Sequence, residues 1–442
     1  MADFTEIYKQ TGNLCKFAPD GESIAIGINQ RLVIRDAHSL DILHLFNCAD
    51  NIQAIEWSQD SELILVASFR LKCFQVWSLK DQNWTAKIDE GLVGCVNVVW
   101  APDSRHILSF SEFQLRITVW SLVTKSAVFI QHPKFSDKGF QFRSDGAYFA
   151  VAESYESKDF ISIYDCSDWT LTKRFPIQTS DLFDLAWSPD GRFIAVWESF
   201  LTYNIFIYHP DGRLAGTYSA YDNMLGIMSV KWSPSAQFLA IGSFDQKCRL
   251  LNSYTWKPLI EFNHPKQVSL PNIVLHKEVD ISNVNNYGGI KSWTSSRPKL
   301  QYEDHMSPFS IPITKVDPEK PNPKMGVGCT LFNCTADILL TCNENQPRVL
   351  WIWDVTTLKQ LAVIQQTQSI SHVEWNPLNP NQLAFCCGNG LLYLWEKSNG
   401  CDAIEVPAVN FNVVKFYWNP DGKSLVLLDK EKFCLSFMVD DE

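Results

Sequence analysis

The sequence predicts an all-β protein, a β-propeller of about nine four-stranded blades that close into one ring. Two observations carry this prediction. An aromatic residue followed by turn residues recurs at nearly constant spacing along the 442 residues, and each copy is followed by runs of alternating apolar and polar residues. Such alternation is typical of strands, and no long segment shows the periodicity of a helix.

Each repeat begins with a short apolar run that ends in tryptophan or phenylalanine and continues into a turn, as in A-W-S-P-D-G at residues 186–191. Successive aromatic residues are 40, 43, 42, 45, 45, 100, 43 and 43 positions apart. Units of this length with four strands are typical of propeller blades. We interpret these aromatic residues as structural repeat anchors that pack between blades: Phe17, Trp57, Trp100, Phe142, Trp187, Trp232, Phe332, Trp375 and Trp418.

The remaining strands of each blade follow its anchor. After 18 to 22 residues comes a second alternating run, such as I-T-V-W at residues 117–120 or W-I-W-D at residues 351–354. A fourth strand is expected in the linking stretches, for example at residues 41–46 and 171–175.

In period and anchor type, nearly the whole chain resembles the WD-repeat family. Only residues 353–354 spell a literal Trp-Asp, and no Gly-His pair precedes an anchor. The His/Asp/Ser/Trp hydrogen-bond network of many WD repeats is therefore not expected in most blades.

The two ends of the chain are expected to complete one blade together. The last unit has strands at residues 409–418, 425–428 and 433–439 but no outer strand, whereas residues 4–9 form an orphan strand before the first anchor. Sharing a blade would remove the exposed sheet edges of an open ring. Two seven-bladed rings would need more residues than the chain has, and two smaller rings are the alternative to one large ring.

One segment interrupts the repeat within the single domain spanning residues 1–442. Residues 263–325 hold 8 of the 21 prolines and several turn-rich runs. We expect a long, Pro-rich, partly disordered insertion that projects from a blade boundary. A degenerate extra blade is the alternative.

Composition excludes several kinds of partner and compartment. The chain carries 38 basic and 49 acidic side chains, a net charge of −11, which argues against nucleic-acid or anionic-membrane binding. No apolar run approaches the ~18 residues of a membrane helix, and the start does not read as a secretory signal. Most of the 13 cysteines lie in apolar runs and none forms a Cys-x-x-Cys pair, so we expect a reducing compartment, cytosolic or nuclear.

The sequence contains none of the common catalytic or nucleotide-binding motifs considered below. The sequence lacks a phosphate-binding glycine loop, a Gly-x-Ser-x-Gly nucleophile elbow and a His-Glu-x-x-His pair. We therefore expect no enzyme activity, no cofactor and no metal site. A rigid propeller without catalytic groups is expected to bind other proteins.

Candidate contacts with a partner are few. Trp293, inside the insertion, is not explained as a packing residue, and Ser307 precedes a proline, as in a proline-directed phosphorylation site. The Trp-Asp-x-Arg motif of cullin substrate receptors fails at its last position in residues 353–356, and the Phe-Arg-Arg-Gly motif of phosphoinositide-binding propellers is not matched at residues 69–71.

Several phrases resemble a narrower family, that of WD repeat-containing protein eight. They are L-R-I-T-V-W-S-L at residues 115–122, K-I-D-E-G at 87–91, Y-S-A-Y at 218–221, W-S-P-S-A-Q-F-L-A at 232–240 and P-K-M-G-V-G at 323–328. The resemblance implies a cytoplasmic, cytoskeletal scaffold of centrosomes, spindle poles and centriolar satellites. Its implied partners are the SSX-interacting coiled-coil microtubule-anchoring protein and, in fungal relatives, a minus-end-directed kinesin. Its implied roles are microtubule minus-end anchoring, mitotic spindle assembly, and centriole and cilium maintenance.

Two other functions stay open at this point. A translation-initiation-factor-like propeller would share the large divergent ring, and sedimentation with ribosomal subunits would distinguish it. An unrecognised hydrolase would need a pocket with converging titratable groups.

Overall fold

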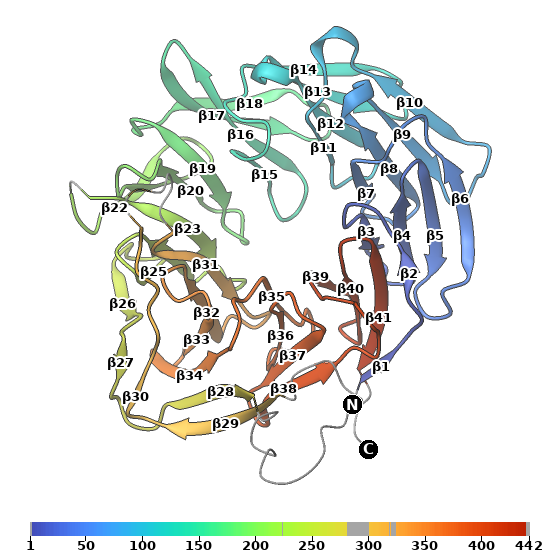
Figure 1. The fold of residues 1–442 in the computed structure, drawn as a ribbon. Coiled ribbons are helices and arrows are strands. Elements are labelled where there is room, and N and C mark those ends of the chain that lie inside the picture. Colours follow the sequence, from blue (N-terminus) through green and yellow to red (C-terminus); the bar gives the residue numbers. More distant parts are fainter. Residues whose placement is uncertain (1, 223, 281–299, 318, 320–323, 439–442) are drawn as a thin grey trace.

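The computed structural model describes residues 2–222, 224–280, 300–317, 319 and 324–438. Its sheets follow one another around a single ring of nine blades (Figure 1). The sequence prediction of one large propeller is therefore confirmed.

Eight blades lie between the two chain ends, and in most of them four strands run in sequence order from the innermost to the outermost. Blades 1 to 3 consist of β3 (Cys15–Phe17), β4 (Ser23–Ile28), β5 (Arg31–Asp36), β6 (Ile42–Asn47), β7 (Ala54–Trp57), β8 (Leu63–Ser68), β9 (Cys73–Ser78), β10 (Thr85–Asp89), β11 (Asn97–Trp100), β12 (His106–Phe110), β13 (Arg116–Ser121) and β14 (Ala127–Gln131). Blades 4 to 6 consist of β15 (Phe140–Phe142), β16 (Tyr148–Tyr155), β17 (Lys158–Asp165), β18 (Leu171–Pro176), β19 (Leu182–Trp187), β20 (Ile194–Glu198), β21 (Ile205–Tyr208), β22 (Leu214–Tyr218), β23 (Ile227–Trp232), β24 (Phe238–Ser243), β25 (Lys247–Asn252) and β26 (Pro258–Asn263). Blades 7 and 8 contain β31 (Val327–Phe332), β32 (Ile338–Asn343), β33 (Val349–Asp354), β34 (Lys359–Gln365), β35 (His372–Trp375), β36 (Gln382–Cys386), β37 (Leu391–Glu396) and β38 (Gly400–Glu405).

Blade 9 closes the ring with strands from both ends of the chain, as the sequence predicts. From the C-terminal part come β39 (Lys415–Trp418), β40 (Ser424–Leu428) and β41 (Lys432–Met438), and from the N-terminus β1 (Ala2–Phe4) and β2 (Tyr8–Lys9). Both N-terminal strands pair antiparallel with β41. Between them, the Thr5 hydroxyl accepts a hydrogen bond from the Leu435 amide at 3.0 Å.

The described parts of residues 263–325 do not project from the ring but extend blade 7. Here β28 (Val274–Asp280) pairs in parallel with the outer strand β34, and β29 (Leu300–Met306) pairs antiparallel with β28. The sheet of blade 7 therefore has six strands. A separate pair, β27 (Gln267–Val268) with β30 (Phe309–Ser310), lies beside it. The partial disorder predicted for residues 263–325 stays a prediction, and residues 281–299, 318 and 320–323 lie outside the described residues.

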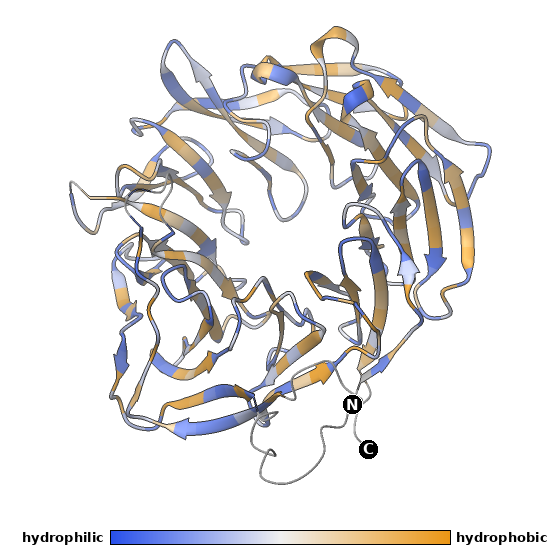
Figure 2. Ribbon diagram, viewed as in Figure 1, coloured by the Kyte–Doolittle hydropathy of each residue, from blue (hydrophilic) through white to orange (hydrophobic). Residues whose placement is uncertain are grey.

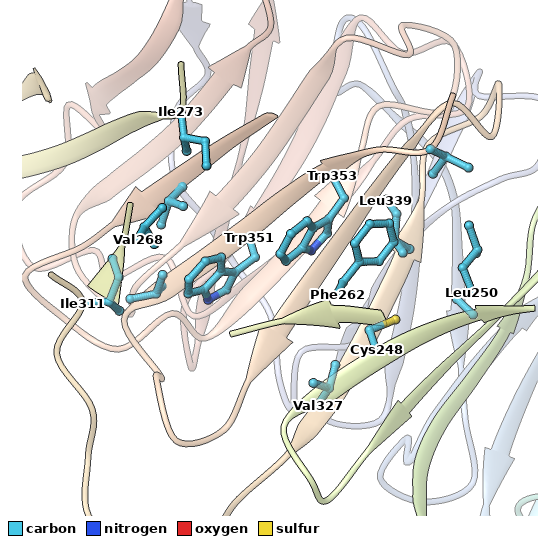
Figure 3. Close-up of a cluster of buried hydrophobic side chains, with 14 of the residues drawn as sticks. Cys248, Leu250, Phe262, Val268, Ile273, Ile311, Val327, Leu339, Trp351 and Trp353 are labelled. Carbon is cyan, nitrogen blue, oxygen red and sulfur yellow. The ribbon is translucent and has the colours of Figure 1, made fainter. Parts of the chain in front are cut away.

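The hydrophobic core is divided into nine clusters, and each cluster joins two neighbouring blades. Figure 3 shows the cluster between blades 6 and 7, where Phe262 and Trp353 stack with ring centroids 4.6 Å apart. In Figure 2 the strands of the blades carry most of the hydrophobic colour. The blades are thus held face to face, because a four-stranded sheet buries both faces only against its neighbours.

Within the described residues, a histidine-containing hydrogen-bond network joins blade 6 to blade 7. The Trp353 indole donates to the Thr341 hydroxyl at 2.8 Å. That hydroxyl lies 2.7 Å from Nε2 of His264, whose Nδ1 lies 2.7 Å from the carbonyl oxygen of Gln246. All polar atoms are satisfied when His264 is neutral, donating from Nδ1 and accepting at Nε2. Burial lowers its pKa from 6.5 to about 4.

Replacing His264 should destabilise the fold in a pH-dependent way. His264→Ala removes the hydrogen-bond partner of the Gln246 carbonyl and one partner of the buried Thr341 hydroxyl. We therefore expect the free energy of unfolding to fall by about 2 kcal/mol near neutral pH. A histidine whose folded-state pKa is lowered loses its stabilising effect as the pH falls from about 6.5 toward 4, so the deficit of the variant should shrink over this range. Denaturant unfolding at several pH values measures both effects. His305→Ala, at an exposed histidine, is the control and should change little; an equal, pH-independent deficit for both variants would contradict the network.

Candidate functional site

The nine predicted anchors are placed as structural residues. Each is the last residue of the innermost strand of its blade. Five tryptophan anchors donate from Nε1 to the carbonyl of the residue that precedes the anchor of the previous blade: Trp57 to Lys16 (3.1 Å), Trp100 to Glu56 (3.1 Å), Trp232 to Ala186 (3.2 Å), Trp375 to Leu331 (3.1 Å) and Trp418 to Glu374 (3.4 Å). These five anchors therefore hydrogen-bond neighbouring blades to each other.

Of the two predicted partner contacts, only Ser307 lies within the described residues. Trp293 lies outside the described residues. Ser307 is half-buried, and its hydroxyl donates to the Leu270 carbonyl at 2.5 Å within the same segment.

Three short 3-10 turns lie at the same end of the strands of blades 2 and 3. They are η1 (Phe69–Leu71), η2 (Gly91–Val93) and η3 (Glu112–Gln114). In an antiparallel meander, the turn after the second strand and the link to the next blade emerge at the same end of the sheet. The turns are also tied to one another, since Lys72 Nζ lies 3.5 Å from the carbonyl oxygen of Leu92 and 3.9 Å from a Glu112 carboxylate oxygen.

These turns present apolar side chains to solvent. Leu92 is 98% exposed and Phe113 is 88% exposed, the highest values among the large apolar residues described. Leu71, Val96 and Leu115 beside them are also exposed. We call these five residues the turn patch. Its rim carries both signs of charge, from Arg70, Lys72, Asp89 and Glu112.

Phe113 has a strained, left-handed backbone conformation, and its side chain is exposed to solvent. Phe113 has φ 57° and ψ 21°, and Gln114 also has a positive φ of 55°. A bulky side chain in this left-handed region costs about 1–2 kcal/mol. The conformation is fixed by Ser111, whose hydroxyl accepts from the Arg116 amide and donates to the Arg116 carbonyl across the turn. Strain of this kind occurs preferentially where side chains bind ligands or partners.

A buried carboxylate supports the patch from below. Glu90 is 7% exposed and accepts a hydrogen bond from the Trp120 indole at 2.6 Å and from the Ser109 hydroxyl. Its amide donates to the Lys72 carbonyl at 3.1 Å, which joins η2 to the end of η1. Glu90 therefore takes in blade 3 the position that His264 holds in blade 7.

A second apolar group lies at the corresponding loops of blades 5 and 6. Phe200, Leu201, Met224 and Leu225 are exposed there, and the Phe200 and Phe244 rings approach to 6.5 Å. These loops also follow second strands or link blades, so both groups open on the same face of the ring.

The described residues hold cavities but no cluster of metal-binding side chains. No set of three or more His, Cys, Asp or Glu side chains there is placed to hold a metal ion. A cavity of about 720 Å³ between blades 6 and 7 is lined mainly by apolar side chains, with Glu261 and Lys359 as its charged groups. No described helix is long and apolar enough to cross a membrane.

The ring, its anchors and its exposed face define the class of protein, a WD-repeat propeller. A model of the WD domain, G-beta repeat, matches residues 212–252. Among solved structures, the C-terminal WD40 domain of Sif2 aligns over 99% of this chain and 98% of that chain, with 10% identity and a TM-score of 0.53, which shows the fold alone.

The particular family follows from closer relatives. WD repeat-containing protein WRAP73 of Mus musculus is 43% identical over 99% of this chain and 96% of its own length. An uncharacterised WD repeat-containing protein of Schizosaccharomyces pombe is 25% identical over 93% of this chain and 87% of its own length. The chain belongs to the WRAP73 family of WD repeat-containing proteins, which confirms the resemblance to WD repeat-containing protein eight.

Sequence reasoning missed the turn patch. Its five residues lie in irregular loops, where neither alternation nor the repeat spacing carries information. The available signal was the apolar L-V at residues 92–93 and F-Q-L at 113–115, flanked by polar turn residues.

Relieving the strain at Phe113 should stabilise the protein. Asparagine tolerates the left-handed region better than phenylalanine, so Phe113→Asn should raise the free energy of unfolding by about 1 kcal/mol. The matched control is Phe129→Asn, at a half-exposed phenylalanine of strand β14, which should lower it. Chemical denaturation measures both, and a loss of stability in Phe113→Asn would contradict the strained geometry.

Proposed function

We propose that the protein is a non-enzymatic interaction scaffold of the centrosome, spindle pole and centriolar satellites. It acts with the SSX-interacting coiled-coil protein in anchoring microtubule minus ends, with a minus-end-directed kinesin as a further member of the assembly. Spindle assembly and the maintenance of centrioles and cilia would follow from this role. Membership of the WRAP73 family supports the scaffold class, and the sequence resemblance supplies the cellular role.

The turn patch is the observation that carries the binding part of the proposal. A monomeric protein rarely exposes several large apolar side chains together unless they contact a partner. Apolar side chains flanked by both signs of charge complement a coiled-coil helix, whose apolar stripe is itself flanked by charged positions. The patch is also preformed, because Glu90 and Ser111 fix its turns, and this lowers the entropy cost of binding.

The binding test uses charged substitutions in the patch. Leu92→Asp combined with Phe113→Asp should weaken binding of the recombinant coiled-coil protein about tenfold or more, since central apolar residues dominate interfaces. Val123→Asp combined with Leu378→Asp is the matched control, at exposed apolar residues in turns on the opposite face. Calorimetric titration of the full chain measures the affinity.

Equal affinity of the two double variants would rule out the turn patch as the docking site. The cellular role has a separate test, because a tagged wild-type chain should enrich at spindle poles and retain the coiled-coil protein on purification. A chain that instead sediments with ribosomal subunits would favour the translation-initiation-factor-like alternative.

A further inference from the structure

Blade 7 places two cysteines directly opposite each other on its two innermost strands. Cys329 of β31 and Cys342 of β32 are partners in the antiparallel register. The Asn333 amide donates to the Ile338 carbonyl at 3.0 Å, which sets the phase of the ladder and makes 329/342 a directly hydrogen-bonded pair of positions. Such positions have Cα atoms about 5.5 Å apart, within the range of about 4.4–6.8 Å that a disulfide spans.

The two cysteines lie side by side on neighbouring strands and are not fully buried. Each thiol shifts the pKa of the other. Both are partly exposed, whereas ten of the other eleven cysteines are buried and Cys334 is exposed. They line a cavity of about 510 Å³ whose other walls include His372 and Val373 of blade 8. A small reagent can therefore reach this pair from the cavity.

The surroundings favour a thiolate on one of the two sulfurs. The neighbouring Cys342 thiol lowers the pKa of Cys329 against the opposing effect of burial, and Lys231 of blade 6 acts in the same direction as Cys342. The neighbouring Cys329 thiol and burial both raise the pKa of Cys342. Because the thiolate is the reactive form, Cys329 is suited to attack a disulfide first, and Cys342 is suited to attack the mixed disulfide that results.

We propose that Cys329 and Cys342 form an oxidisable dithiol that exchanges with low-molecular-weight disulfides of the glutathione type. The Cys329 thiolate attacks one sulfur of the small disulfide, breaks its S–S bond and releases one thiolate. Cys342 then loses its proton, attacks the Cys329 sulfur in the mixed disulfide and releases the second thiolate. Two protein thiols are oxidised, and one small disulfide is reduced to two thiols.

The disulfide would link β31, the innermost strand of blade 7, covalently to its neighbour β32. β31 follows residues 263–325, and Gly326 beside it is packed so closely against blade 6 that a Cβ there would lie 2.7 Å from the Cα of Phe244. Linking β31 to β32 would hold this strand in the ring, and oxidation is expected to slow hydrogen exchange of both strands.

The test is a redox titration of the full chain with oxidised and reduced glutathione, followed by alkylation and peptide mass spectrometry. The expected product is a peptide pair linked between Cys329 and Cys342, with the loss of two hydrogens. The exposed Cys334, which has no opposing cysteine, is the internal control and should gain one glutathione.

Two serine variants separate the roles of the thiols. In Cys342→Ser, Cys329 should accumulate as the glutathione mixed disulfide, because nothing resolves it. In Cys329→Ser, Cys342 should stay largely unmodified. Circular dichroism melts check that both variants fold, and the wild-type titration decides the proposal without them.

The proposal is overturned if Cys329 and Cys342 of the wild type are both alkylated at glutathione ratios that fully modify Cys334. It is equally overturned if Cys329 of the wild type carries a stable glutathione without forming the linked pair.

Discussion

Face-to-face packing between neighbouring blades is the interaction on which the rest of this structure depends. Each of the nine apolar clusters is built from two blades, so no blade has a complete core of its own. The cluster between blades 9 and 1 obeys the same rule and includes Tyr8, which stacks on Phe433 at 5.5 Å. The ring is closed only when blade 9 packs against blade 1, and the N-terminal strands β1 and β2 stabilise this contact.

The rigidity of the ring explains how its loops can hold unfavourable conformations. Phe113 keeps a left-handed backbone and an exposed ring because β12 and β13 fix both ends of its turn and Glu90 joins the neighbouring turns. The strain at Phe113 reduces stability slightly, and in the proposed function it prepares the turn patch for binding. On this proposal, stability and function are separated in space, with the apolar clusters between the blades and the binding groups on the loops.

The fold was predictable from the sequence because its signals are local and repeated. The anchor spacing gave the number of blades, and the missing outer strand of the last unit gave the closure by β1 and β2. The structure of residues 263–325 was not predictable, because β28 pairs in parallel with β34 across some 80 intervening residues and no local pattern encodes that contact. The role of Glu90 was hidden for another reason, since a carboxylate there replaces the histidine that the repeat pattern leads one to seek.

The closed ring is tested most directly by hydrogen–deuterium exchange on the full chain and on a chain that lacks residues 1–10. The account predicts that amides of β41 and of β4 lose protection in the shortened chain, because β41 loses its partner strands and the cluster between blades 9 and 1 loses Tyr8. Blades 4 and 5, on the far side of the ring, should keep theirs. Unchanged protection of β41 in the shortened chain would contradict closure through the N-terminus.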